Sequence, residues 1–265
     1  MMNRLGLVSW RLPGDIFNTI YICKKYDINF LQLDYGGHAR GPFINSYCAK
    51  DMKLIALQNN VKFSAIALNV FNDIGVNINP SYCKKIFIDA LSLTEKLEVS
   101  TIFIPAFRQS SINNELDLIN TAGFFRWCCD VADSNITVAS ENILTPDKCK
   151  MLCLLVGRHN FKVIYDPANL FCNSVDPFEY LVEMMPNIHS DIHIKSPNGN
   201  SLLSLEKNFI SLIDYISLMP ESIISNINFF LENDYRINMK GDIESDISWI
   251  KKHSPFRGYG YEKTF

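Results

Sequence analysis

Short apolar runs alternate along the chain with longer segments in which apolar residues recur every three to four positions. The short runs are typical of buried strands, and the longer segments are typical of helices that pack one face against a sheet. We expect strands at 4–10, 29–35, 61–68, 101–107, 136–142, 161–167, 188–196 and 227–232. We expect helices at 15–25, 46–58, 81–97, 114–132, 145–156, 176–185, 205–218 and 243–253, with Asp15 as a helix N-cap and Gly157 as a helix stop.

Regular alternation of strands and helices predicts parallel strands joined by helical crossovers. Eight such units in 265 residues have the size of an α/β fold of the single (β/α)8 TIM barrel type. A doubly wound open sheet is the main alternative, but no G-x-G-x-x-G motif follows the first expected strand. Because no linker or shift in composition divides the chain, we expect one barrel domain over residues 1–265.

The stretch from Asp191 to Ser196 places an imidazole and an ammonium group on one face of an expected strand. Side chains alternate along a strand, so Ile192 and Ile194 point one way while His193 and Lys195 point the other. Three other expected strands carry a carboxylate at or near their C-terminal ends: Glu141, Asp166 and Glu232. Active sites of barrels form where the C-terminal ends of the strands meet, so we expect these groups to converge.

Three carboxylates and one imidazole in a barrel mouth would repel one another and would be costly to bury. A divalent cation removes this cost. Three oxygen ligands and one nitrogen suit Mn²⁺, Mg²⁺, Co²⁺ or Zn²⁺ without choosing among them. A single acidic residue at a strand end is usually structural, and the joint pattern on four strands favours a metal site made by Glu141, Asp166, His193 and Glu232.

Composition narrows the class of protein. The chain is 48% hydrophobic and 20% charged, with a net charge of −3, which is typical of a globular enzyme and not of a nucleic-acid coat protein. No apolar run is long enough to span a membrane, and the N-terminus lacks the hydrophobic region of a signal peptide, so we expect a cytoplasmic protein. The eight cysteines form no C-x-x-C pair and are expected to be mostly buried free thiols.

Four short motifs carry a resemblance to a known family. They are Ala-Ser-Glu-Asn at Glu141, Tyr-Asp-Pro-Ala-Asn at Asp166, Ile-His-Ile-Lys at His193 and Phe-Leu-Glu-Asn at Glu232. In strand order over the whole chain they resemble the sugar phosphate isomerase/epimerase family, within the xylose isomerase-like TIM barrel superfamily. The resemblance implies one divalent metal on these four residues. The chain departs from many relatives in having Asp34 in place of Glu and Asn169 in place of His.

The resemblance implies proton abstraction from the carbon next to a carbonyl of a small sugar, sugar phosphate or related ketone, through an enediolate. By similarity to ketose epimerases, Glu141 and Glu232 would lie on opposite faces of the substrate, one taking the proton and the other returning it. Return to the same carbon gives epimerisation, and return to the neighbouring carbon gives isomerisation. The candidate substrate-binding residues are Trp10, Asn69, Arg108, Asn169, Lys195 and Arg236, where Lys195 could bind the substrate or neutralise the carboxylates.

Three other functions are compatible with a barrel of this kind. A dehydratase of an inosose-like ketone would use the same site and expel a β-hydroxyl group. An endonuclease IV-like phosphodiesterase is disfavoured because His38 is the only histidine in the first half and the chain is not basic. A non-catalytic sugar-binding barrel is the third. We expect a small sugar or sugar phosphate as the partner, no nucleic acid and no membrane, with a homo-oligomer as a further expectation.

Overall fold

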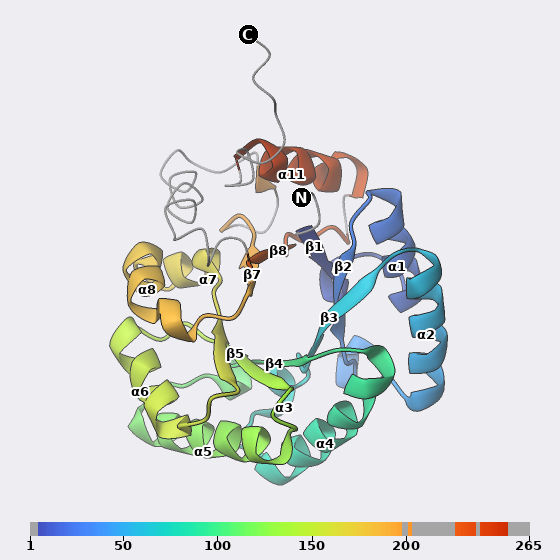
Figure 1. Ribbon diagram of the computed structural model, residues 1–265. Helices are drawn as coiled ribbons and strands as arrows, with labels where there is room; N and C mark the ends of the chain where they lie inside the picture. Colours follow the sequence, from blue (N-terminus) through green and yellow to red (C-terminus); the bar gives the residue numbers. More distant parts are fainter. Residues whose placement is uncertain (1–4, 198–200, 203–225, 237–238, 254–265) are drawn as a thin grey trace.

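The computed structural model describes residues 5–197, 201–202, 226–236 and 239–253, and in these ranges eight parallel strands form a nearly closed barrel (Figure 1). The strands are β1 (Leu5–Val8), β2 (Phe30–Asp34), β3 (Lys62–Ala67), β4 (Thr101–Pro105), β5 (Thr137–Glu141), β6 (Phe161–Ile164), β7 (Asp191–Ile194) and β8 (Asn228–Leu231). Their order in the sheet is β6-β5-β4-β3-β2-β1-β8-β7. A parallel bridge between Val163 of β6 and Ile188, three residues before β7, connects the two ends of the sheet, so the predicted TIM barrel is confirmed.

A ring of helices surrounds the barrel (Figure 1). The helices are α1 (Ile16–Lys25), α2 (Ser46–Gln58), α3 (Phe71–Ile74), α4 (Pro80–Leu97), α5 (Glu115–Val131), α6 (Pro146–Val156), α7 (Pro167–Cys172), α8 (Pro177–Met184) and α11 (Met239–His253). The described ranges also contain the 3-10 turns η1 (Ser9–Arg11), η2 (His38–Arg40), η3 (Arg108–Ser110) and η4 (Met185–Asn187). None of the helices in the described ranges offers a stretch long and apolar enough to cross a bilayer. The helix expected at 205–218 lies outside these ranges.

Local sequence signals explain where these helices begin and end. The side chain of Asp15 accepts a hydrogen bond from Asn18 N and caps α1, as predicted. Gly157 ends α6 with φ of 59°, a left-handed conformation that costs glycine nothing. The strand expected at 161–167 stops at Ile164, because Pro167 begins α7 and the side chain of Asp166 caps it. The segment between the strand expected at 61–68 and the helix expected at 81–97 contains the short helix α3, which was not predicted.

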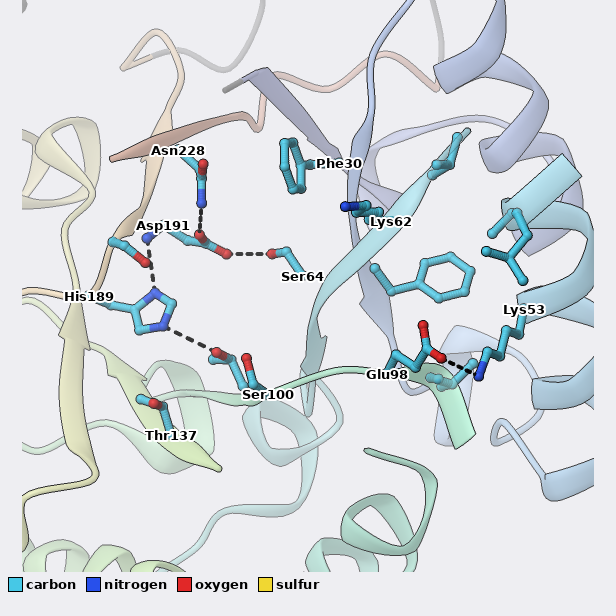
Figure 2. Close-up of a pocket in the computed structure, with 17 residues that line it drawn as sticks. Phe30, Lys53, Lys62, Ser64, Glu98, Ser100, Thr137, His189, Asp191 and Asn228 are labelled. Atoms are coloured by element: carbon cyan, nitrogen blue, oxygen red, sulfur yellow. Dashed lines mark hydrogen bonds and ion pairs between the residues drawn. The ribbon is translucent and has the colours of Figure 1, made fainter. Parts of the chain in front are cut away.

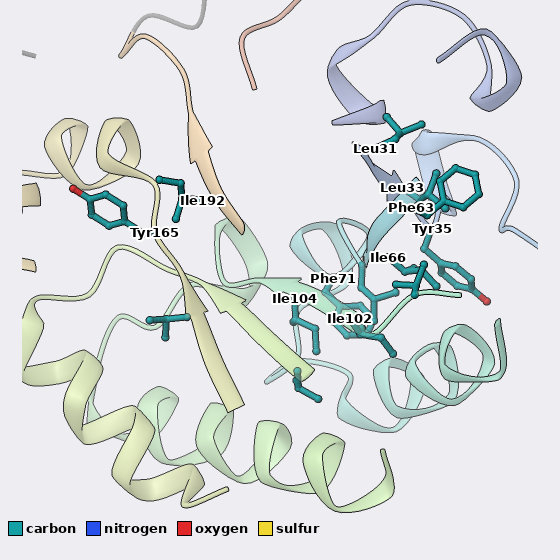
Figure 3. Packing of buried hydrophobic residues seen from close by; sticks show 14 of the residues in the cluster. Leu31, Leu33, Tyr35, Phe63, Ile66, Phe71, Ile102, Ile104, Tyr165 and Ile192 are labelled. Carbon is teal, nitrogen blue, oxygen red and sulfur yellow. The ribbon is translucent and has the colours of Figure 1, made fainter. Parts of the chain in front are cut away.

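The strands separate two apolar layers. Outward residues such as Val138 and Ile192 pack under the helices in the main core, and Figure 3 shows part of this layer. The barrel interior holds a second cluster: Ala65, Ala67, Phe103, Ala139 and Ile164. The predicted alternation is therefore confirmed for β7, where Ile192 and Ile194 both belong to the main core. A Cβ at Gly6 would lie 2.2 Å from Cε1 of Phe230, so glycine makes room for that ring.

The eight cysteines are free thiols, as expected from the sequence. Five of them are buried: Cys23, Cys83, Cys128, Cys129 and Cys149. The other three, Cys48, Cys153 and Cys172, are partly or fully exposed.

The carboxylate of Asp246 on α11 joins several segments near the end of β8. It accepts hydrogen bonds from Tyr235 Oη at 2.8 Å, Asn233 Nδ2 at 2.6 Å and Leu202 N at 2.7 Å. Asn233 in turn accepts a hydrogen bond from Ser196 N at 2.9 Å, just after β7. This buried network therefore holds together the ends of the two strands that lead to Lys195 and Glu232.

We expect Asp246→Ala to lower the free energy of unfolding by about 2–5 kcal/mol, because several buried donors lose their acceptor together. Urea unfolding followed by circular dichroism measures this loss. Asp130→Ala is the control, since Asp130 pairs with Arg158 at the surface, where ion pairs contribute about 0–1 kcal/mol. Equal effects of the two substitutions would contradict a structural role for the buried network.

Candidate active site

Four ionisable side chains meet at the C-terminal ends of β5 to β8. Glu141 is the last residue of β5, Asp166 lies between β6 and α7, His193 is in β7, and Glu232 directly follows β8. All four are buried, and one potential ligand atom of each lies within 4.8 Å of the others. The structure thus brings together the four residues that the strand ends suggested, which we call the four-residue cluster.

The donor atoms of the four-residue cluster suit a divalent cation. His193 Nδ1 lies 3.5 Å from Glu141 Oε2 and 3.6 Å from Glu232 Oε2. His193 Nδ1 is buried and has no hydrogen-bond partner within the described part of the chain. A buried polar atom without a hydrogen bond is costly, and metal coordination would satisfy this nitrogen. The residues present therefore fit a divalent metal.

Lys195 brings a positive charge into the four-residue cluster. Its Nζ lies 2.6 Å from Glu232 Oε2 and 2.7 Å from Asp166 Oδ2. Although burial lowers the pKa of this ammonium group, the neighbouring carboxylates raise it above its ordinary value overall. Of the two roles considered for Lys195 from the sequence, neutralisation of the carboxylates is the one that these contacts support.

The groups of the four-residue cluster shift one another's pKa values. Burial raises the pKa of Asp166 to about 7, and the charges of Glu141 and Glu232 add to the rise while Lys195 opposes it. Burial disfavours the charged form of His193, but the surrounding carboxylates raise its pKa overall. For Glu232, burial also raises the pKa, yet Lys195 and His193 outweigh it and lower the value to about 2. Protons therefore compete with any metal for this site.

Two neighbours hold the carboxylates in place. Asn169 Nδ2 donates a hydrogen bond to Glu141 Oε1 at 2.6 Å, and Trp10 Nε1 donates one to Glu232 Oε1 at 2.8 Å. Each glutamate thereby keeps its Oε2 atom on the side of His193. The ring of Trp10 also lies at 6.1 Å, between centroids, from the rings of Phe103 and His193. Asn169 and Trp10, both expected to bind substrate, thus contact the four-residue cluster directly.

The two arginines proposed from the sequence lie farther out. Arg108 and Arg236 line a cavity of about 760 Å³ that Trp10 and Asp34 also border. Arg108 forms an ion pair with Asp73 at 3.2 Å, and Arg236 pairs with Asp234 two positions earlier in the chain.

Asp34, the last residue of β2, borders the same cavity and interacts with Asn69. Asn69 is buried after β3. Burial raises the pKa of Asp34, whereas Arg40 and the amide of Asn69 oppose the rise. Asn69 therefore lowers the pKa of Asp34, and its expected role toward a substrate stays a prediction.

Three residues near the site were not expected from the sequence. Arg11 Nε lies 3.8 Å from Glu232 Oε1, and Arg40 borders the cavity beside Asp34. Gln32 is fully buried in β2, and its Oε1 lies 2.9 Å from His193 Nε2. A signal for Gln32 was present, because a lone amide between Leu31 and Leu33 must face the barrel interior. The loop arginines carried no such signal.

Comparison with known proteins finds relatives in sequence and in fold. No protein-family model matches the chain. The chain is 27% identical over 256 residues to a 2-epi-5-epi-valiolone 7-phosphate 2-epimerase of Actinoplanes sp., and the match covers 95% of each protein. A sugar phosphate isomerase/epimerase from Parabacteroides distasonis has a TM-score of 0.70 at 16% identity, covering 97% of this chain and 96% of the other.

A D-psicose 3-epimerase structure gives a TM-score of 0.76 at 12% identity, covering 95% of this chain and 99% of the other. The identities to these two solved structures are low and show a shared fold alone. The similarity in sequence comes from the Actinoplanes epimerase. The resemblance predicted from the four strand-end motifs is therefore confirmed. The chain is an isomerase-class enzyme that resembles the sugar phosphate isomerases and epimerases and has the xylose isomerase-like TIM barrel fold.

Proposed function

We propose that this chain is a divalent-metal-dependent epimerase of a small phosphorylated ketone that carries several hydroxyl groups. The four-residue cluster is the observation that carries the proposal, since it places two glutamates and a metal-type ligand set in one barrel mouth. The similarity to a 2-epimerase of a valiolone 7-phosphate supports epimerisation over the other reactions of this fold.

The chemical difficulty is the weak acidity of a C–H bond next to a carbonyl. Glu141, Asp166, His193 and Glu232 would hold a divalent ion, which supplies Lewis-acid polarisation of the carbonyl oxygen when bound. Glu141 and Glu232 would exchange the proton with opposite faces of the substrate carbon. Removal by one and return by the other inverts the configuration of that carbon. Their hydrogen bonds to Asn169 and Trp10 would keep both carboxylates oriented during this exchange.

The cavity beside the mouth would receive the phosphate group. Arg108, Arg236 and Arg40 border it, and guanidinium groups bind phosphate oxygens in a bidentate geometry. All three currently pair with aspartates: Arg40 and Arg108 with Asp73, and Arg236 with Asp234. A phosphate in this cavity would therefore share these arginines with the aspartates.

Proton exchange with solvent gives a direct test of this function. The protein is stripped of metal with EDTA, reloaded with Mn²⁺, Mg²⁺, Co²⁺ or Zn²⁺, and incubated in D₂O with phosphorylated polyhydroxy ketones, including 2-epi-5-epi-valiolone 7-phosphate. We expect deuterium on the carbon next to the carbonyl and the appearance of its epimer, both dependent on metal and both detected by NMR. The dephosphorylated ketones should react more slowly, because the arginines then have no phosphate to bind.

The same spectra distinguish the alternatives. Loss of water from the substrate in place of epimer formation would identify a dehydratase, which the similarity to an epimerase does not favour. No reaction with any metal and any ketone would contradict the proposal. Four other expectations from the sequence stay predictions: a cytoplasmic location, a homo-oligomer, the absence of nucleic acid among the partners, and a single domain over residues 1–265.

A further inference from the structure

A buried carboxylate lies at the opposite end of β7 from the barrel mouth. Asp191 is two residues before His193 and points to the same side of the strand. It borders a cavity of about 580 Å³ at the N-terminal end of the barrel, shown in Figure 2. Its Oδ1 accepts a hydrogen bond from Asn228 Nδ2 at 2.8 Å, and its Oδ2 accepts one from Ser64 Oγ.

Gln32 connects this carboxylate with the candidate active site. Its side chain is fully buried inside the barrel, between Asp191 and His193. Gln32 Nε2 donates a hydrogen bond to Asp191 Oδ2 at 3.4 Å, and Gln32 Oε1 lies 2.9 Å from His193 Nε2. A continuous line of polar groups therefore runs through the barrel interior from Asp191 to the four-residue cluster.

The direction of these hydrogen bonds follows from their chemistry. An ionised carboxylate can only accept hydrogen bonds, so the NH₂ group of Gln32 must face Asp191. The carbonyl oxygen of Gln32 then faces His193, and an oxygen acceptor requires a proton on His193 Nε2. In a neutral imidazole this leaves the lone pair on Nδ1, which is the ring nitrogen near Glu141 and Glu232.

We infer that Gln32, oriented by Asp191, is a positioning residue that fixes His193 in the tautomer whose Nδ1 is free to bind the metal. This inference rests on the metal site of the proposed function, and it assigns a role to two residues outside the ligand set. A partner on the second ring nitrogen fixes both the proton and the ring orientation of a metal-binding histidine. A buried glutamine in an otherwise apolar strand interior is thereby explained.

Gln32→Leu tests the inference because it keeps a similar volume and removes the acceptor for His193. We expect the affinity for Mn²⁺, measured by isothermal titration calorimetry, to fall by about 10–100-fold. Asn160→Leu is the matched control, since Asn160 is also a buried amide but bonds to the backbone oxygens of Cys129 and Ile136. It should cost stability and leave the Mn²⁺ affinity unchanged.

A rescue variant separates hydrogen bonding from packing. The double variant Gln32→Glu/Asp191→Asn exchanges the two kinds of side chain. The carboxylate at position 32 can accept a hydrogen bond from His193 Nε2, and the amide NH₂ group at position 191 can donate one to that carboxylate. We expect this double variant to regain most of the Mn²⁺ affinity lost in Gln32→Leu. A folded Gln32→Leu protein with the affinity of the wild type would overturn the inference, as would a double variant no better than Gln32→Leu.

Nitrogen NMR of the imidazole ring gives a readout that needs no metal. The measurement uses metal-free protein at alkaline pH, where the imidazole ring is neutral and carries one ring proton. In the wild type we expect this proton of His193 on Nε2. In Gln32→Leu we expect it to exchange between Nε2 and Nδ1. A wild-type proton on Nδ1 would overturn the inference. If the tautomer is as expected but the wild type binds none of the four metals, the proposed function fails and the positioning of His193 stands.

Discussion

Glu232→Gln is expected to lower kcat for epimerisation by about 10²–10⁴-fold, the range that general acid–base catalysis contributes. The carboxylate of Glu232 accepts hydrogen bonds from Trp10 Nε1 and Lys195 Nζ. A glutamine amide cannot accept from both with its two terminal atoms, because its NH₂ group would face one of these donors. Under the proposed mechanism, the variant also loses the base on one face of the substrate.

Isotope exchange distinguishes loss of one base from loss of the whole site. If Glu141 remains active, Glu232→Gln should still exchange deuterium into one epimer of the substrate while forming almost none of the other. Glu141→Gln should show the opposite preference. Metal content, measured by mass spectrometry, must accompany each assay because both glutamates belong to the four-residue cluster.

Glu183→Gln is a suitable control for the glutamate variants, since Glu183 pairs with Lys150 at the surface of α8. It should retain the wild-type kcat. A Glu232→Gln protein with its metal bound and kcat within a factor of about ten of the wild type would exclude Glu232 as a catalytic base, since that loss is below the usual contribution of such a group.

The barrel could be predicted from the sequence because its signals are local. The alternation along the strand at His193 predicted that Ile192 and Ile194 share one face, and the structure has both in the outer apolar layer. Glu141, Asp166, His193 and Glu232 were found for the same reason, since chemistry at successive strand ends converges in any parallel barrel. Knowledge of the fold class was sufficient to bring these four residues together.

The contacts that the sequence did not reveal join residues far apart in the chain. Gln32 and His193 are 161 positions apart, and no local pattern indicates that their side chains meet. Arg40 approaches the mouth on a loop that has no hydrophobic period to place it. The end of β6 was placed too late because Pro167 was assigned to the strand, although proline at the first position of a helix was the stronger signal.

Lys195→Met is expected to destabilise the metal-free protein by about 3–5 kcal/mol, the usual cost of removing one partner from a buried ion pair. Lys195 is 12% exposed, and its partners Asp166 and Glu232 are 1% and 7% exposed. Without the ammonium group, two buried carboxylates lose a counter-charge that solvent cannot replace. Urea unfolding in EDTA measures the loss, and Lys150→Met, in an exposed pair with Glu183, should cost only about 0–1 kcal/mol.

Addition of Mn²⁺ should largely reverse the destabilisation of Lys195→Met. A ligand that binds only the folded state stabilises it by about 4 kcal/mol at a thousand times its Kd, which is comparable with the loss. The gain from Mn²⁺ should be larger in the variant than in the wild type, because the ammonium group no longer competes with the cation for Asp166 and Glu232. A variant that Mn²⁺ fails to stabilise would show that Lys195 supports metal binding, and the neutralising role would then be wrong.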